Sequence, residues 1–104
     1  MNFRGLLFLS LMPSVGLALP EGFVIRRFAG PPQIEYPTAA TAAANGDLYI
    51  SSDKNASLGH AKGFGKIVRA TDTDGDGKAD RFQDFVPDVN SPRGGHFVDG
   101  TLYL

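Results

Sequence analysis

The densest group of potential metal ligands lies in one short acidic segment. It contains four aspartates, Asp72, Asp74, Asp76 and Asp80. They match positions 1, 3, 5 and 9 of an EF-hand calcium loop, and Gly77 stands at position 6. Alternate carboxylates on a tightly curved backbone converge on one hard cation, and glycine permits the positive φ that the curve needs. The segment therefore predicts a Ca²⁺ site of weak affinity.

The same segment departs from an EF-hand in two respects. Position 12 is Gln83, so the bidentate glutamate is missing, and both flanks have the composition of strands. The prediction is therefore a hairpin connection that resembles a Ca²⁺ loop. From Asp72 to Asp88 there are six acidic residues against Lys78 and Arg81, and without a cation those carboxylates repel one another. The alternative is a solvated Asp/Gly turn that needs no metal, since both residues favour turns.

The remaining polar residues give weaker patterns. His96 could act as a base, but in a short alternating strand a histidine is more often structural. His60 lies in a Gly-rich loop with no second ligand nearby. Arg93 could contact an anionic group, but a loop arginine is usually solvated. From the sequence we assign no catalytic and no cofactor-binding residue.

The elements that position these residues have the composition of strands. One apolar run, Gly22–Ala29, ends at Gly30-Pro31-Pro32 and is expected to be a short strand. After the N-terminal segment, no window keeps the apolar period of a helix, so the expected fold class is all-β. Asn45-Gly46 between two of the runs predicts a hairpin turn. Four further strands are expected at Thr38–Ala44, Asp47–Ser51, Gly65–Thr71 and Ala79–Val86.

A repeat refines this fold class. The hairpin Asn-Gly-Asp-Leu-Tyr-Ile (45–50) recurs as Asp-Gly-Thr-Leu-Tyr-Leu (99–104). One period contains four expected strands, which is typical of a β-propeller blade and favours a propeller over a generic sandwich. The first blade is expected at about residues 36–88 and the start of the next at 91–104. Propellers close at roughly four to eight blades, so residues 19–104 are expected to be one to two N-terminal blades, incomplete as a domain.

Composition excludes several classes of protein. The chain has 104 residues and a formal net charge of −1, which gives no basic surface for nucleic acid. It contains no cysteine, which excludes a disulfide framework, a thiolate metal site and a haem c attachment motif within this sequence.

Residues 1–18 have the pattern of a signal peptide. A positive charge at Arg4 precedes an apolar run, and the small residues Gly16 and Ala18 fit the −3 and −1 positions of a cleavage site. We expect cleavage after Ala18, export to the periplasm or the extracellular space, and no stable membrane span afterwards. An uncleaved anchor is the alternative, but the apolar run is short and Pro13 interrupts it.

The chain resembles the bacterial membrane-bound dehydrogenase family, whose propellers are similar to quinoprotein glucose/sorbosone dehydrogenases. The motifs that carry the resemblance are Leu-Pro-Glu-Gly-Phe (19–23), Asn-Gly-Asp-Leu-Tyr-Ile (45–50), Gly-Lys-Ile-Val-Arg (65–69), Asp-Thr-Asp-Gly-Asp-Gly-Lys-Ala-Asp (72–80) and Ser-Pro-Arg-Gly-Gly (91–95). The resemblance implies that the intact protein oxidises a sugar or other alcohol with pyrroloquinoline quinone (PQQ). Many members carry a C-terminal haem c domain, and this chain has no such part. The segment alone is expected to be inactive. The alternative is a non-enzymatic Ca²⁺-binding propeller module that binds carbohydrate or protein.

Overall fold

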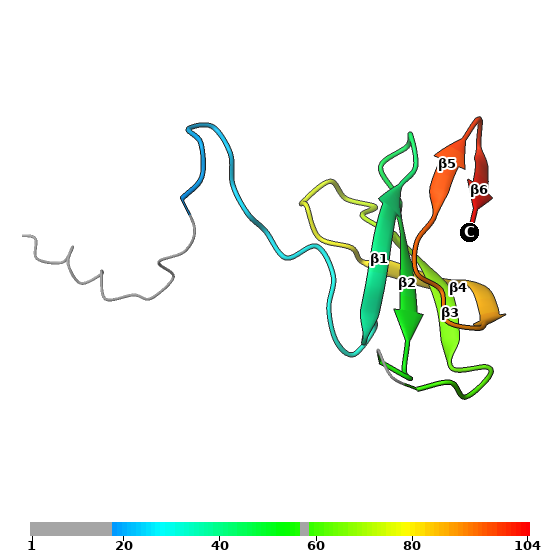
Figure 1. Cartoon of the computed structure of the whole chain (residues 1–104). Helices are drawn as coiled ribbons and strands as arrows, with labels where there is room; N and C mark the ends of the chain where they lie inside the picture. The colour runs from blue at the N-terminus through cyan, green and yellow to red at the C-terminus, as the bar shows by residue number, and fades with distance from the viewer. Residues whose placement is uncertain (1–17, 57–58) are drawn as a thin grey trace, which may run out of the picture.

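The computed structural model describes residues 18–56 and 59–104 (Figure 1). The expected signal peptide lies outside the described residues except for Ala18. Within the described ranges every regular element is a strand, which confirms the expected all-β class. In that part of the chain, no helix is long and apolar enough to cross a membrane.

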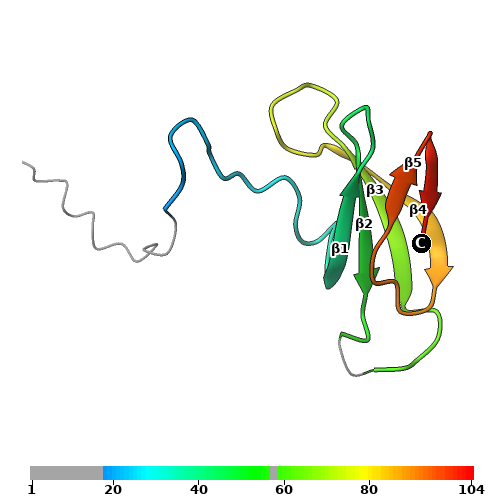
Figure 2. The same ribbon diagram turned by 45° about the horizontal axis from the view of Figure 1, so that its top comes forward.

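Four consecutive strands form one antiparallel sheet in the order β1-β2-β3-β4. Their bounds are β1 Pro37–Ala42, β2 Leu48–Asp53, β3 Gly65–Thr71 and β4 Arg81–Val89. β3 has the predicted bounds, whereas β2 and β4 begin and end later than predicted. The loop between β3 and β4 lies at the same end of the sheet as the β1–β2 turn, as both views show (Figures 1 and 2).

A second hairpin follows the sheet, and its sequence resembles that of the β1–β2 hairpin. β5 (His96–Val98) pairs with β6 (Thr101–Tyr103) across the two residues Asp99 and Gly100, whose φ angles are 48° and 79°. Positive φ at both positions is typical of a type I′ turn, which matches the twist of the strands. The hairpin lies over one face of the sheet, where β5 contacts β1 and Phe97 packs on Tyr49 of β2.

The β1–β2 connection differs from the predicted two-residue Asn-Gly turn. β1 ends at Ala42 and β2 begins at Leu48, so the connection runs over residues 43–47. Within it the Gly46 N–H donates to the Ala43 carbonyl at 3.0 Å. Gly46 alone has positive φ here, 96°, and Asn45 does not. The Ala43 N–H also donates to the Asp47 carbonyl at 2.9 Å, and the Asp47 N–H is held by the Asn45 side chain. A longer loop, closed around a turn and a left-handed glycine, therefore replaces the tight turn.

The two faces of the sheet are covered by different parts of the chain. On one face, the buried side chains of Ile50, Val68 and Ala70 pack with Ile34 from the segment before β1. On the other face, the ring of Tyr49 makes edge-to-face contacts with Phe85 and with Phe97 of β5, at centroid distances of 4.8 and 4.7 Å. Successive side chains of a strand point to opposite faces of the sheet. One set of apolar side chains therefore packs under the segment before β1, and the other set packs under the β5–β6 hairpin.

The predicted strand at Gly22–Ala29 is wrong. The segment has no regular structure, and Phe23, Val24 and Ile25 are exposed by 68%, 71% and 60%. The Phe28 carbonyl accepts the N–H of Ala79, in the β3–β4 loop, at 2.8 Å. β-Propensity reports the fit of side chains to a pleated surface, so a run with no neighbouring strand does not form a ladder.

Candidate functional site

The structure brings three of the four predicted aspartates together at one end of the sheet. Carboxylate oxygens of Asp72, Asp74 and Asp80 lie within 4.8 Å of one another. The fourth, Asp76, is not in this group, and its carboxylate instead accepts the Lys78 N–H at 2.9 Å. Three oxygen donors of this kind, on a β3–β4 loop open to solvent, suit a hard cation such as Ca²⁺.

Backbone amides hold these carboxylates in place. The two oxygens of Asp72 accept the N–H groups of Gly75 and Gly77, each at 2.8 Å. Both glycines have positive φ, 77° and 87°, which turns their N–H groups into the loop. Asp80 accepts the backbone N–H and the hydroxyl of Thr73 across the loop. The carboxylates are therefore positioned by the loop itself.

The carboxylates of the loop differ in their ease of ionisation. The N–H of Gly77, followed by that of Gly75, lowers the pKa of Asp72. The N–H of Asp76 lowers the pKa of Asp74, but the hydrogen bond with Asp72, partial desolvation and the charges of Asp76 and Asp80 outweigh it, so the net shift is upward. A neighbouring cation relieves this repulsion.

A buried ion pair that the sequence analysis did not identify stands at the same end. Asp47 is 4% exposed, and Nε and Nη2 of Arg69 lie 2.7 and 2.6 Å from its Oδ2. Burial raises the pKa of Asp47, but hydrogen bonds from Arg69 and Thr71 outweigh it and hold that pKa below its usual value. Arg69 also lies over the ring of Tyr49, 6.0 Å from its centroid. We call this ion pair closed, because the Asp47 carboxylate and the Arg69 guanidinium contact each other at 2.6 and 2.7 Å.

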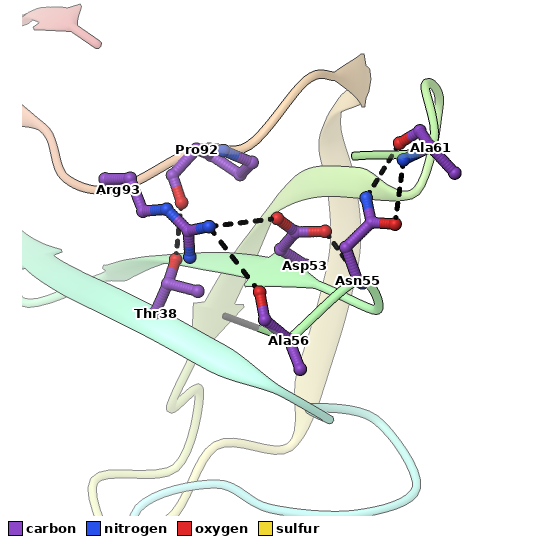
Figure 3. A network of polar contacts seen from close by, with 7 residues as sticks. All are labelled: Thr38, Asp53, Asn55, Ala56, Ala61, Pro92 and Arg93. Atoms are coloured by element: carbon purple, nitrogen blue, oxygen red, sulfur yellow. Dashed lines mark hydrogen bonds and ion pairs between the residues drawn. The ribbon is translucent and has the colours of Figure 1, made fainter. Parts of the chain in front are cut away.

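A second buried aspartate lies at the opposite end of β2 (Figure 3). Asp53 is fully buried, and its Oδ1 accepts the Asn55 N–H at 2.9 Å. Its Oδ2 has no hydrogen-bond partner among the described residues, and the nearest cation is Arg93 Nη2 at 3.7 Å. The same nitrogen lies 3.5 Å from the Ala56 carbonyl. The expectation that Arg93 is a solvated loop arginine is therefore only half right: its side chain is 51% exposed, and it faces a buried carboxylate.

The segments that carry these two residues are tied together. The Thr38 hydroxyl donates to the Pro92 carbonyl at 2.6 Å, which joins β1 to the residue before Arg93. A Cβ built on Gly65 would lie 2.5 Å from Pro92 Cδ, so this close approach requires glycine. The sequence analysis did not predict the Asp53–Arg93 pair, because no spacing rule links the end of one strand to a distant Ser-Pro-Arg-Gly-Gly segment.

The two histidines lie outside these groups. His60 is exposed in the β2–β3 loop, and His96 is exposed at the start of β5. Neither takes part in the polar contacts that surround Asp53 or Asp72.

Comparison with known proteins places the chain in one family. No curated protein and no solved structure matches it. The sequence model of a family described as "Domain of unknown function (DUF7133)" matches residues 14–103, which is most of the chain. The chain therefore belongs to the DUF7133 family.

Proposed function

We propose that this chain is a Ca²⁺-binding blade, with the start of a second blade, of a β-propeller in an exported protein. The single observation that supports Ca²⁺ binding is the convergence of Asp72, Asp74 and Asp80 within 4.8 Å. The loop supplies oxygen donors only, and its backbone amides already donate to all three carboxylates. Because the group is open to solvent and lacks a bidentate glutamate, the affinity is expected to be low.

The propeller assignment is supported by the repeat of one structural unit. A four-stranded antiparallel meander is followed by a second antiparallel hairpin, whose sequence at residues 99–104 resembles that at 45–50 although its turn is tighter than that between β1 and β2. This second hairpin packs on the face of the sheet, as Tyr49 and Phe97 show, and does not extend its edge. Successive sheets that pack face to face are the arrangement of propeller blades.

For the intact protein we propose oxidation of a sugar or another alcohol with PQQ. The support is the family resemblance carried by the ordered motifs between residues 19 and 95, and we assign no described residue to the quinone or the substrate. The non-enzymatic alternative, a Ca²⁺-binding propeller that binds carbohydrate or protein, needs only the acidic loop and the blades. Dye-linked turnover by the protein purified from its own cells, with PQQ and Ca²⁺ added, separates the two. Turnover of a sugar or alcohol supports the dehydrogenase, and its absence across both classes supports the alternative.

Calorimetric titration of the full chain with CaCl₂ tests the Ca²⁺ site. We expect saturable binding that Asp74→Asn weakens at least tenfold, because a neutral amide oxygen replaces one of the three carboxylates that converge. Asp76→Asn is the matched control, since its carboxylate lies outside the group, and it should change the affinity by less than Asp74→Asn does. No heat of binding up to millimolar Ca²⁺, or equal losses in the two variants, would contradict the proposed site.

A further inference from the structure

The buried carboxylate of Asp53 is the least satisfied polar group among the described residues. Its Oδ2 is shielded from solvent and accepts no hydrogen bond, although a carboxylate oxygen accepts two or more. Such a group costs free energy unless something supplies a donor. In native proteins it marks a place where a water, an ion or a ligand completes the structure.

Arg93 is the only cation within 4.0 Å of this oxygen among the described residues, and it is loosely held. Its contacts with Asp53 and Ala56, at 3.7 and 3.5 Å, are at or beyond the limit of a hydrogen bond. A guanidinium has five N–H donors in a fixed fork, so Arg93 retains donors for another acceptor. Arg69 shows the contrast, because it spends two of its nitrogens on Asp47 at 2.6 and 2.7 Å.

The backbone around the pair is fixed while the guanidinium is not. Thr38 holds Pro92, and the Asn55 side chain makes two hydrogen bonds with Ala61, at 2.7 and 3.1 Å (Figure 3). Asn90 accepts the Gly63 N–H at 3.0 Å, which joins the two loops. The Arg93 side chain is half-exposed and its polar contacts with the described residues are 3.5 Å or longer, so we infer that it can move toward solvent while the backbone stays in place.

The chemistry of the pair selects its ligand. Oδ2 needs a donor and the guanidinium needs an acceptor, and a hydroxyl group is both at once. An anion would satisfy Arg93 but leave Oδ2 without a donor, and a cation would do the reverse. The pair is also neutral as a unit, so it offers no net attraction to a charged ligand. Neighbouring hydroxyls on one molecule can serve the two side chains together.

We propose that Asp53 and Arg93 form a binding site for the hydroxyl groups of a neutral polyol, at the end of the sheet opposite the acidic loop. This site deepens the proposed function and rests on it in one respect, that the protein handles a hydroxylated ligand. It requires no Ca²⁺ and no redox step, because binding replaces the long Arg93–Asp53 contact with hydrogen bonds through the ligand.

The test is a titration of the full chain, labelled with ¹⁵N, with sorbitol as the probe. We expect a saturable shift at the backbone amide of Asn55, which donates to Asp53, with chelator present as well as with Ca²⁺. Arg93→Lys keeps the charge and loses the fork, and it should weaken binding at least tenfold without changing the melting temperature. Arg69→Lys is the matched control and should leave the sorbitol affinity unchanged.

The outcomes separate this site from the rest of the account. Amide chemical-shift changes that grow linearly with sorbitol concentration and spread over the chain are a solvent effect, and they would overturn the polyol site. Equal sorbitol affinity in Arg93→Lys and the wild type would overturn it as well. A saturable shift with sodium acetate or inorganic phosphate, but none with sorbitol, would show an anion site and overturn it too. Loss of Ca²⁺ binding or of turnover leaves the sorbitol result intact, so failure here and failure of the proposed function are distinguishable.

Discussion

β2 carries a buried aspartate at each end, and the two are built differently. Asp47, just before the strand, has two nitrogens of Arg69 within 2.7 Å of one oxygen. Asp53, its last residue, has Arg93 no nearer than 3.7 Å and one oxygen without a hydrogen bond. In each case a buried aspartate faces a partly exposed arginine. The distances between the charged groups distinguish the complete pair from the incomplete one.

The difference shows how the two ends of the sheet divide their roles. At the Asp47 end the buried charge is satisfied within the chain, and our proposal assigns a ligand to the exposed carboxylates of the β3–β4 loop. At the Asp53 end the segments are tied together at Thr38 and Gly65, and our proposal assigns a ligand to the incomplete pair itself. A buried ion pair is therefore a weak guide to stability until its distances are known.

The largest effect on stability is expected from a substitution that prevents the close approach of Gly65 to Pro92, near Asp53. In Gly65→Ala the new Cβ overlaps Pro92 and the Val89 carbonyl, so the fold should lose about 1–3 kcal/mol as in other overpacked sites. Denaturant unfolding of the full chain measures this. Gly94→Ala is the control, because nothing lies within 4 Å of a Cβ at that position, and it should be nearly neutral. Equal losses in both variants would show that the close approach at Gly65 is not what holds this end.

Charge-conserving substitutions compare the two pairs directly. Arg69→Lys removes one short hydrogen bond and one short ion-pair contact with Asp47, so it should lower the free energy of unfolding more than Arg93→Lys does. Arg93→Lys removes no short hydrogen bond and should cost less than about 0.5 kcal/mol. Urea unfolding midpoints at neutral pH give both values. A reversed order would contradict the description of one pair as closed and the other as open.

A smaller effect is expected from acid. Because the pKa of Asp47 is lowered in the fold, its ionised form stabilises the protein above the pKa of the unfolded chain, and this stability is lost as pH falls through the lower, folded value. The gap in melting temperature between the wild type and Asp47→Asn should therefore stay constant near neutrality and narrow below about pH 4. If the difference in melting temperature widens on acidification, the pKa of Asp47 is not lowered in the fold.

Much of the sheet could be predicted from the sequence, because turn residues bound the strands. Gly65 and the Asp/Gly loop delimit β3, whose bounds match the prediction. Propensity misplaced a strand at Gly22–Ala29, where no neighbouring strand offers a ladder. It also gave a two-residue turn at Asn45-Gly46, where a longer loop forms.

The candidate sites divide in the same way. Asp72, Asp74 and Asp80 were predictable because one local motif positions them, and only the curvature that turns Asp76 aside was not. Asp53 and Arg93 meet through the packing of Pro92 on Gly65, which is a property of the folded chain. A single charged residue at a strand end carries no signal of its distant partner.

The most direct test of the central claim, that the acidic loop binds Ca²⁺, is a Ca²⁺ titration of the ¹⁵N-labelled full chain. We predict saturable shifts at the amides of Gly75 and Gly77, which donate to Asp72, and none at Asn55 at the other end of β2. No shift up to millimolar Ca²⁺, or shifts of equal size at both ends, would contradict it.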